Sequence, residues 1–336
     1  MRIAVVGLGF MGMVHLKAIR NIARHQLTAV VSASPEKLEG DLSNIAGNLG
    51  GPGEKMDFSG IGRYTSVEQC LADPNVDAVD LCLPTHLHVP TTIAALRAGK
   101  HVLVEKPMAL TGEQCDLLLE EAQKAGRTLM VAQVLRFFPA YLALRDTLPR
   151  LGSVRSAFLR RRCAGPAWAK WLVSKEQSGG GIFDLVIHDV DQCVQNFGVP
   201  EYVSSTGYEN LAAGIDVMES QLYYGNGMVA TVTGGWHHPK SYPFSMEYTV
   251  VADQGTVEYS SAGREPTLYR ADGEKEVLPL VDIDGYQAEI EYFLDCAEAG
   301  KEPEICSPKE SAQAVRLTNL MAEARSKNGE KVRCQI

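Results

Sequence analysis

The segment GGGIFDLVIHDVDQ, residues 179–192, combines residue types that can exchange protons or bind a metal ion. With about 100° of rotation per helical residue, Asp184, His188 and Asp191 lie on one face of a helix. Asp189 points elsewhere, and we expect it to be a solvated charge. A histidine titrates near neutral pH, and a carboxylate one helical turn away can fix its tautomer. The segment therefore predicts an acid–base pair, a metal site, or a buried histidine satisfied by its own helix.

A second cluster, Glu105-Lys106-Pro107, directly follows the apolar segment 101–104. A reaction that removes a proton from an alcohol needs one group that moves the hydroxyl proton and another that stabilises negative charge on the oxygen. Lys106 at a strand end could supply that positive charge, or it could be an ordinary surface lysine. Because a lysine makes a metal unnecessary for this chemistry, we expect no metal ion beside His188. The glycines at 179–181 are expected to leave room for a ligand there.

A glycine-rich motif, GLGFMG, lies between the strand-like segments 2–6 and 27–31. In this context G-x-G-x-x-G is typical of dinucleotide binding. The first glycine permits a tight turn, the second lets the backbone approach a pyrophosphate, and the third lets the helix pack closely on the strand. The first amides of that helix can then hold phosphate groups. The expected cofactor contacts of this turn are Gly7, Gly9, Phe10, Met11 and Gly12.

The end of the second strand indicates which cofactor is bound. NAD-binding proteins commonly place a carboxylate there to bind the adenosine ribose. Here Ser32, Ser34 and Lys37 occupy that region, and they could bind a 2′-phosphate. We therefore favour NADP over NAD. A structural alternative is that Ser34 caps a helix that begins at Pro35.

The elements that position these residues alternate between strands and helices over residues 1–134. Strand-like segments at 76–83, 101–104 and 128–134 alternate with helical patterns, which predicts a parallel sheet with helices on both faces. Ligands bind at the carboxyl ends of such strands. Further expected cofactor contacts are Leu83, Pro84, Thr85, His88, Glu105 and Lys106. The glycine-rich segment 40–62 is expected to form a long surface loop.

Residues 135–336 show a different pattern, which predicts an α+β domain with a largely antiparallel sheet. Gly225-Asn-Gly227 is a hairpin signature between two alternating segments. The expected strands are 153–162, 201–209, 217–224, 228–235, 245–251 and 255–260, and the expected helices are 137–148, 182–197, 286–299 and 308–326. The fold class is thus α/β, with a dinucleotide-binding domain at 1–134 and a separate α+β domain at 135–336.

Composition narrows the function classes. The chain has 336 residues, of which 45% are hydrophobic and 22% charged, as in soluble globular proteins of two domains. A net charge of -9 argues against nucleic-acid or membrane-surface partners. No export signal or membrane-spanning segment is evident, and the eight cysteines are scattered. We therefore expect reduced cysteines and a cytoplasmic location.

Five motifs occur in a familiar order: GLGFMG, CLPTHLHVP, AGKHVLVEKPMAL, LRFFPAY and SGGGIFDLVIHDVD. Together they resemble the Gfo/Idh/MocA oxidoreductases. The resemblance implies a Rossmann domain followed by a substrate-binding and oligomerisation domain at 135–336. In the family, one face of that domain's large open sheet carries the active-site helix, and the other commonly forms a homodimer or homotetramer. It also implies that Lys106 bonds to the reacting oxygen and that Asp184 and His188 are the catalytic pair. SASPEK at 32–37 is similar to the S-x-S-x-x-R pattern of NADP-using sugar reductases, with lysine in place of arginine.

The expected function is that of an NAD(P)-dependent oxidoreductase acting on a sugar, polyol or inositol-like substrate. Two alternatives stay open: an NAD-assisted glycosidase, and a dinucleotide-sensing regulator without catalysis. The expected substrate contacts are Arg136, Trp168, Trp171, Asp191 and His237.

Overall fold

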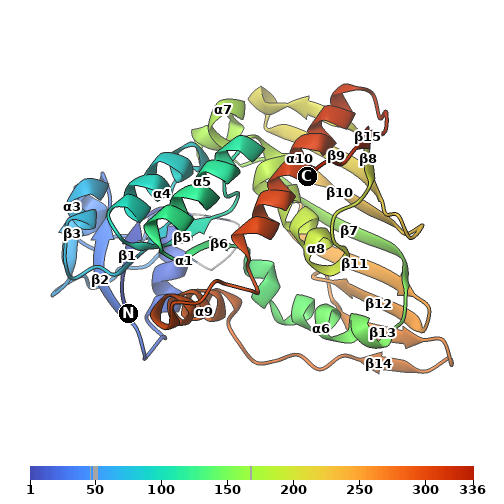
Figure 1. The fold of residues 1–336 in the computed structure, drawn as a ribbon, viewed down its shortest axis with the longest axis horizontal. Coiled ribbons are helices and arrows are strands. Elements are labelled where there is room, and N and C mark those ends of the chain that lie inside the picture. Colours follow the sequence, from blue (N-terminus) through green and yellow to red (C-terminus); the bar gives the residue numbers. More distant parts are fainter. Residues whose placement is uncertain (46, 48–51, 167–168) are drawn as a thin grey trace. The chain divides into compact units, whose positions relative to one another are not determined.

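The computed structural model describes residues 1–45, 47, 52–166 and 169–336, which form two units (Figure 1). The first unit contains Met1–Phe137 and Ile283–Ala312. The second contains Phe138–Asp282 and Gln313–Ile336. The sequence pattern changes after residue 134, close to residues 137–138, where the chain first passes from the first unit to the second.

The first unit is built on a six-stranded parallel sheet with the order β3-β2-β1-β4-β5-β6. This order places the turn after β1 at the point where the strand order reverses, which is where doubly wound sheets bind ligands. The expected parallel sheet is confirmed. Its strands are β1 (Arg2–Val6), β2 (Gln26–Val31), β3 (Gly62–Tyr64), β4 (Ala78–Leu81), β5 (His101–Glu105) and β6 (Leu129–Ala132).

Helices cover this sheet, and one of them comes from the far end of the chain. They are α1 (Phe10–Ile19), α2 (Pro35–Leu38), α3 (Val67–Leu71), η1 (Thr85–Leu87), α4 (His88–Arg97), α5 (Gly112–Ala125), η2 (Val134–Phe137) and α9 (Gly285–Ala299). Ile290, Phe293 and Leu294 of α9 are buried in the same core as Ile3 and Val5 of β1. The apolar side of α9 therefore completes the first core, although the sequence grouped residues 286–299 with the second domain.

The glycine-rich segment 40–62 is not simply a surface loop. Leu42 and Phe58 are buried in the core of the first unit. Asp41 forms an isolated antiparallel bridge with Lys55, and the Met56 amide donates to the Gly40 carbonyl. The two ends of the segment are thus anchored by apolar side chains that a composition rich in glycine concealed.

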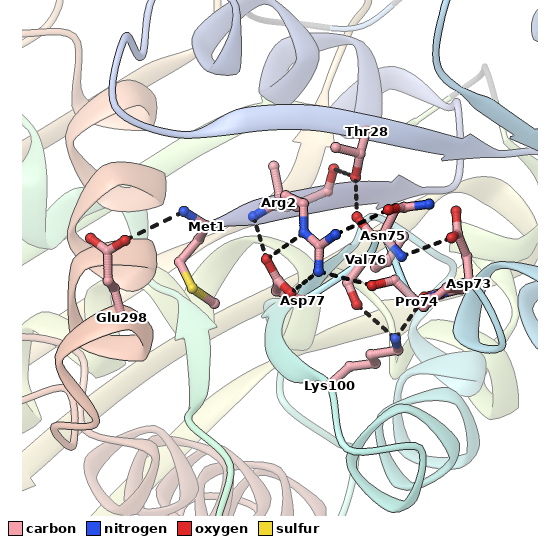
Figure 2. A network of polar contacts seen from close by, with 11 residues as sticks. Met1, Arg2, Thr28, Asp73, Pro74, Asn75, Val76, Asp77, Lys100 and Glu298 are labelled. Carbon is pink, nitrogen blue, oxygen red and sulfur yellow. Dashed lines mark hydrogen bonds and ion pairs between the residues drawn. The ribbon is translucent and has the colours of Figure 1, made fainter.

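Polar contacts fasten the amino-terminal edge of this sheet (Figure 2). Arg2 Nη2 lies 2.7 Å from Asp77 Oδ1, and its Nε donates to Asp77 Oδ2 at 3.0 Å. Lys100 Nζ donates to the carbonyl oxygens of Asp73 and Val76 at 2.9 and 2.6 Å. These contacts join β1, β4 and β5 at the edge opposite to their carboxyl ends.

The second unit is built on a nine-stranded sheet with the order β14-β13-β12-β11-β7-β10-β9-β8-β15. The pairing is antiparallel throughout except between β7 and β10, which are parallel. The expected large, mostly antiparallel sheet and the hairpin between β9 and β10 are confirmed. The strands are β7 (Val154–Ala164), β8 (Tyr202–Asn210), β9 (Ile215–Tyr223), β10 (Val229–His238), β11 (Ser245–Ala252), β12 (Gly255–Ser260), β13 (Arg264–Arg270), β14 (Lys275–Val277) and β15 (Val332–Arg333).

The remaining elements include the helix that carries the predicted acid–base pair. They are α6 (Pro139–Thr147), η3 (Leu148–Arg150), η4 (Lys170–Val173), α7 (Lys175–Ser178), the π-helical turn η5 (Ile182–Val186), α8 (Ile187–Phe197), η6 (Leu211–Ala213) and α10 (Pro308–Ser326), which passes from the first unit into the second. Figure 1 shows α8 lying along the sheet beside β7 and β10.

All eight cysteines belong to the described residues and are free thiols. Within those residues no helix is both long and apolar enough to cross a membrane.

Candidate functional site

The glycine-rich turn after β1 has the geometry that dinucleotide binding requires. Gly7 has φ +99°, and a Cβ atom added to Gly12 would lie 1.9 Å from the Gly7 carbonyl oxygen. A side chain at Gly12 would therefore push α1 away from the turn. Around Gly9, by contrast, no atom of the described residues other than its chain neighbours lies within 4 Å of an added Cβ. The turn thus leaves open space where the first amides of α1 begin, and it fits a pyrophosphate.

Two loops meet at the carboxyl ends of β4 and β5. His88 is buried, and its ring nitrogens each lie 2.8 Å from a carbonyl oxygen, that of Pro107 and that of Leu83. His88 thereby ties the loop after β4 to the loop after β5. Because both ring nitrogens lie against carbonyl oxygens inside the unit, His88 holds these two loops together. Its contact with the cofactor stays a prediction.

Lys106 follows β5 directly and is half-buried, whereas the preceding Glu105 is buried. The Lys106 amide donates to Glu105 Oε2 at 3.1 Å. The Glu105 side chain therefore holds the backbone from which the Lys106 side chain extends.

The region after β2 carries the predicted adenosine-side contacts. The Ser34 amide donates to Ser32 Oγ at 3.1 Å, and Ser34 precedes α2 without a capping hydrogen bond from its side chain. The Ser34 side chain therefore does not cap α2, although Ser34 stands at the N-cap position. Lys37 lies in α2, half-buried, one turn from this hydroxyl.

Asp184 and His188 lie on a segment that is not a regular α-helix. Asp184 belongs to the π-helical turn η5, and His188 to the first turn of α8. Both are half-buried, while the residues between them are buried. Single π-helical turns inside helices are frequent at functional sites. The two predicted catalytic side chains are thus the ones that this segment leaves accessible.

The glycines before this segment make room for protein rather than for a ligand, which corrects the sequence interpretation. Gly180 has φ +83°, and an added Cβ would lie 2.6 Å from Asp216 Oδ2. At Gly181 an added Cβ would lie 3.0 Å from the indole of Trp236. These glycines therefore allow η5 to pack directly on β9 and β10.

A buried carboxylate, which the sequence analysis missed, holds the beginning of η5. Asp216 is 0% exposed, and its Oδ2 accepts from the Ile182 amide at 3.2 Å. Arg325 donates to Asp216 Oδ1 at 2.6 Å and to Glu209 Oε2 at 2.7 Å. Burial raises the pKa of Asp216, and Arg325 opposes that rise. The available signal was the alternation of β9, in which Asp216 takes a core-facing position.

A second buried ion pair fixes α8, and here the expectation of a solvated Asp189 was wrong. Asp189 is buried, and its two oxygens lie 2.9 and 3.3 Å from Nη2 and Nε of Arg161 on β7. Arg161 Nη2 also donates to the Tyr141 hydroxyl at 3.2 Å. The helical rotation correctly predicts that Asp189 points away from the face of Asp184 and His188. That side of α8 faces the sheet, where Arg161 occupies a core-facing position of β7.

The predicted substrate contacts differ in their burial and in the residues that they contact. Arg136 is 1% exposed, donates to the Ile305 carbonyl at 2.7 Å and pairs with Glu310, all within the first unit, and its contact with substrate stays a prediction. Asp191 is 1% exposed, and its contact with substrate stays a prediction. Trp171 packs against the cluster that contains Trp236. His237 is exposed at the end of β10, and Trp168 lies outside the described residues.

Among the described residues, the side chains close enough to share a metal ion are His15 with Asp80 and Cys82, and His25 with Asp295 and Glu298. The His188 segment contributes to neither group.

Two family models match this chain, one in each unit. The family model described as "Oxidoreductase family, NAD-binding Rossmann fold" matches residues 1–133, and the "GFO/IDH/MocA C-terminal domain" matches residues 147–258. The chain is 30% identical over 258 residues to 1,5-anhydro-D-fructose reductase of Ensifer adhaerens, covering 73% of this chain and 77% of that one. The chain belongs to the Gfo/Idh/MocA oxidoreductase family.

Two further similarities span almost the whole chain of this Gfo/Idh/MocA protein. It is 27% identical to D-xylose 1-dehydrogenase (NADP(+)) 2 of Haloferax volcanii, over 96% of this chain and 97% of that one. Levoglucosan dehydrogenase, solved with NADH and levoglucosan, superimposes with a TM-score of 0.84 at 18% identity, over 100% of both chains. That likeness shows the shared fold. The first unit is therefore an NAD(P)-binding Rossmann domain of an oxidoreductase family.

Proposed function

We propose that the protein transfers a hydride between nicotinamide and a secondary alcohol or ketone of a sugar, polyol or inositol-like substrate. The observation that carries the proposal is the retention, in a member of this oxidoreductase family, of an accessible Lys106, Asp184 and His188. Relatives named for D-xylose and 1,5-anhydro-D-fructose support a polyhydroxylated substrate. A regulator without catalysis would have no need to keep all three side chains.

Each proposed role follows from the chemistry of its side chain. When bound, the nicotinamide supplies the acceptor or donor of the hydride. His188 takes or gives the hydroxyl proton, and Asp184 orients its ring. Lys106 places a positive charge on the oxygen as negative charge develops there. The proposed contacts for the remaining hydroxyl groups are Arg136, Trp168, Trp171, Asp191 and His237.

NADP is the proposed cofactor, with NAD as the alternative. The Ser34 hydroxyl is not used as a helix cap, and Lys37 follows in α2. Neither residue repels a 2′-phosphate, whereas a carboxylate at this position would. Affinities for NADPH and NADH, measured by fluorescence titration, test this choice. Equal affinities in the wild type and in a Lys37→Ala variant would contradict it.

The open sheet of the second unit is the proposed surface for a homodimer or homotetramer. Tyr202 and Tyr208 on β8 are 40% and 59% exposed, and large exposed aromatic side chains favour an interface. Light scattering after size exclusion should give a mass of two or four chains. A Tyr208→Glu variant is expected to lower that mass, and a monomeric wild type would contradict the proposal.

Turnover is the test of the proposed function. Purified protein is mixed with NADPH or NADH and a panel of ketoses and inosose-like ketones, and loss of the reduced cofactor is followed. The expected result is oxidation with at least one of them. Tight cofactor binding without turnover on any substrate would favour the sensing regulator, and product that carries a cleaved glycosidic bond would favour the glycosidase.

A further inference from the structure

We propose that His15, held as a cation between Asp80 and Glu105, is a positioning residue for Lys106; this inference rests on the proposed function of Lys106. The three buried side chains lie within the first unit, below the carboxyl ends of β4 and β5. The proposed hydride chemistry gives no role to His15 or Asp80, and Glu105 enters it only as a predicted cofactor contact.

The geometry around His15 favours a doubly protonated ring. His15 lies on α1 and is 0% exposed. Its Nδ1 lies 2.8 Å from Asp80 Oδ2, a hydrogen-bond distance. Its Nε2 lies 3.2 Å from Glu105 Oε1, as an ion pair rather than an aligned hydrogen bond. An ionised carboxylate only accepts hydrogen bonds, so a ring placed between two of them is suited to carry a proton on each nitrogen.

Glu105 connects this ring to the proposed catalytic lysine. One carboxylate oxygen, Oε1, faces His15, and the other, Oε2, accepts from the Lys106 amide at 3.1 Å. The side chain therefore bridges α1 and the backbone at the end of β5. Because the direction of a side chain follows from its backbone, a fixed Glu105 sets where the lysine chain begins.

Other groups face the same cluster from the elements packed against it. Cys82, after β4, has its Sγ 3.4 Å from His15 Nδ1. The ring of Tyr286 on α9 lies 6.0 Å from the His15 ring, centroid to centroid. His88 and Lys106 also interact electrostatically with the Glu105 carboxylate.

Charge interactions agree with this arrangement. Burial lowers the pKa of His15, but the charge of Asp80 and the neighbouring Cys82 raise it, and the net pKa is well above the usual value. Burial raises the pKa of Glu105, but His15 and Lys106 lower it, and the net pKa is below the usual value. The stabilisation from His15 is thus present below its unfolded pKa and is lost as pH rises through its folded pKa.

A metal ion is the competing occupant, because ligand atoms of His15, Asp80 and Cys82 lie within 4.8 Å of one another. The 2.8 Å contact between Nδ1 and Asp80 Oδ2 favours a shared proton over a metal between them. Elemental analysis of the purified protein is expected to find no stoichiometric metal. One zinc or other transition-metal ion per chain would overturn the proposal.

Nuclear magnetic resonance of nitrogen-15 histidine tests the charge without requiring turnover. The His15 signal is assigned by its loss in His15→Gln. At about pH 8, where an ordinary histidine is neutral, both ring nitrogens of His15 should still carry protons. In Glu105→Gln the ring should become neutral at a lower pH. A neutral His15 at about pH 8 in the wild type would overturn the proposal.

Hydrogen exchange and kinetics then test the link to Lys106. Asp80→Asn should speed exchange of the Lys106 amide at least tenfold, lower kcat at least tenfold, and leave the KM for cofactor nearly unchanged. Lys100→Met is the matched control, since it removes a buried cation at the opposite edge of the sheet (Figure 2) and should change neither exchange at Lys106 nor kcat. Unchanged exchange in Asp80→Asn would overturn the proposal. If the wild type turns over no substrate, the function of Lys106 fails, whereas the exchange result still decides the positioning.

Discussion

The buried pair between Arg161 and Asp189 gives the sharpest stability prediction. Asp189→Asn keeps the shape of the side chain but leaves the Arg161 guanidinium buried without a countercharge. Their side chains are 3% and 0% exposed, so water cannot compensate. Breaking such a pair costs about 3–5 kcal/mol. With a guanidinium m value of about 4 kcal/mol/M, the unfolding midpoint should fall by roughly 0.7–1.2 M.

Tryptophan fluorescence is the assay suited to this change. Of the three tryptophans, Trp171 and Trp236 belong to the second unit, and Trp168 lies outside the described residues, so tryptophan emission reports the unit that contains α8. The double variant Arg161→Met/Asp189→Leu removes both charges and should recover most of the loss.

A surface pair in the same unit is the control. Lys327, the residue after α10, has its Nζ 2.6 Å from Oε1 of Glu323 in the last turn of that helix, and both side chains are nearly half exposed. Glu323→Gln should leave the midpoint unchanged within error. If Asp189→Asn moved the midpoint no more than this control does, the inference of a buried, energetically coupled pair would be refuted.

Three further outcomes follow from the structure. Gly12→Ala should weaken NADPH binding at least tenfold in fluorescence titration, because its Cβ would overlap the Gly7 carbonyl; unaltered affinity would contradict the close packing of that turn. The hydrogen bond from Arg2 lowers the pKa of Asp77, so the stabilisation that this carboxylate gives is present above its unfolded pKa and is lost as pH falls through its folded pKa. Asp77→Asn should therefore lower the thermal midpoint at neutral pH and change it less in acid. An equal loss at both pH values would count against the pairing. Burial raises the pKa of Cys334 to about 11, so its alkylation near neutral pH should be slow until the protein is denatured, and rapid labelling of the native protein would disagree with this.

The sequence predicts most of the architecture because its periodicities are strong. Residues 2–6, followed by Gly7, and 101–104, followed by Glu105-Lys106-Pro107, are short and mostly apolar, and they become β1 and β5. β13 and β14 escape prediction because they are outer strands of the sheet, rich in charge, with Pro266 inside β13. Edge strands need no continuous apolar pattern.

The accessible part of the candidate site is also predictable, since Lys106, Asp184 and His188 belong to recognisable motifs. The residues that hold this site in place are not predictable, because Asp216 lies far in the sequence from Ile182, whose amide donates to it. A charged residue at a core-facing position of an alternating strand, as at Asp216 and Arg161, is the signal for a buried partner elsewhere in the chain. Which partner it finds depends on the tertiary fold.

The direct test of the central claim compares Lys106→Met and His188→Asn with the wild type, using the best ketone of the panel and NADPH. Loss of a charge on the reacting oxygen lowers kcat by about 10²–10³-fold, and loss of an acid–base group by about 10²–10⁴-fold. The account predicts losses of this size with cofactor affinity retained within a few fold. Near-wild-type kcat/KM in either variant would contradict it.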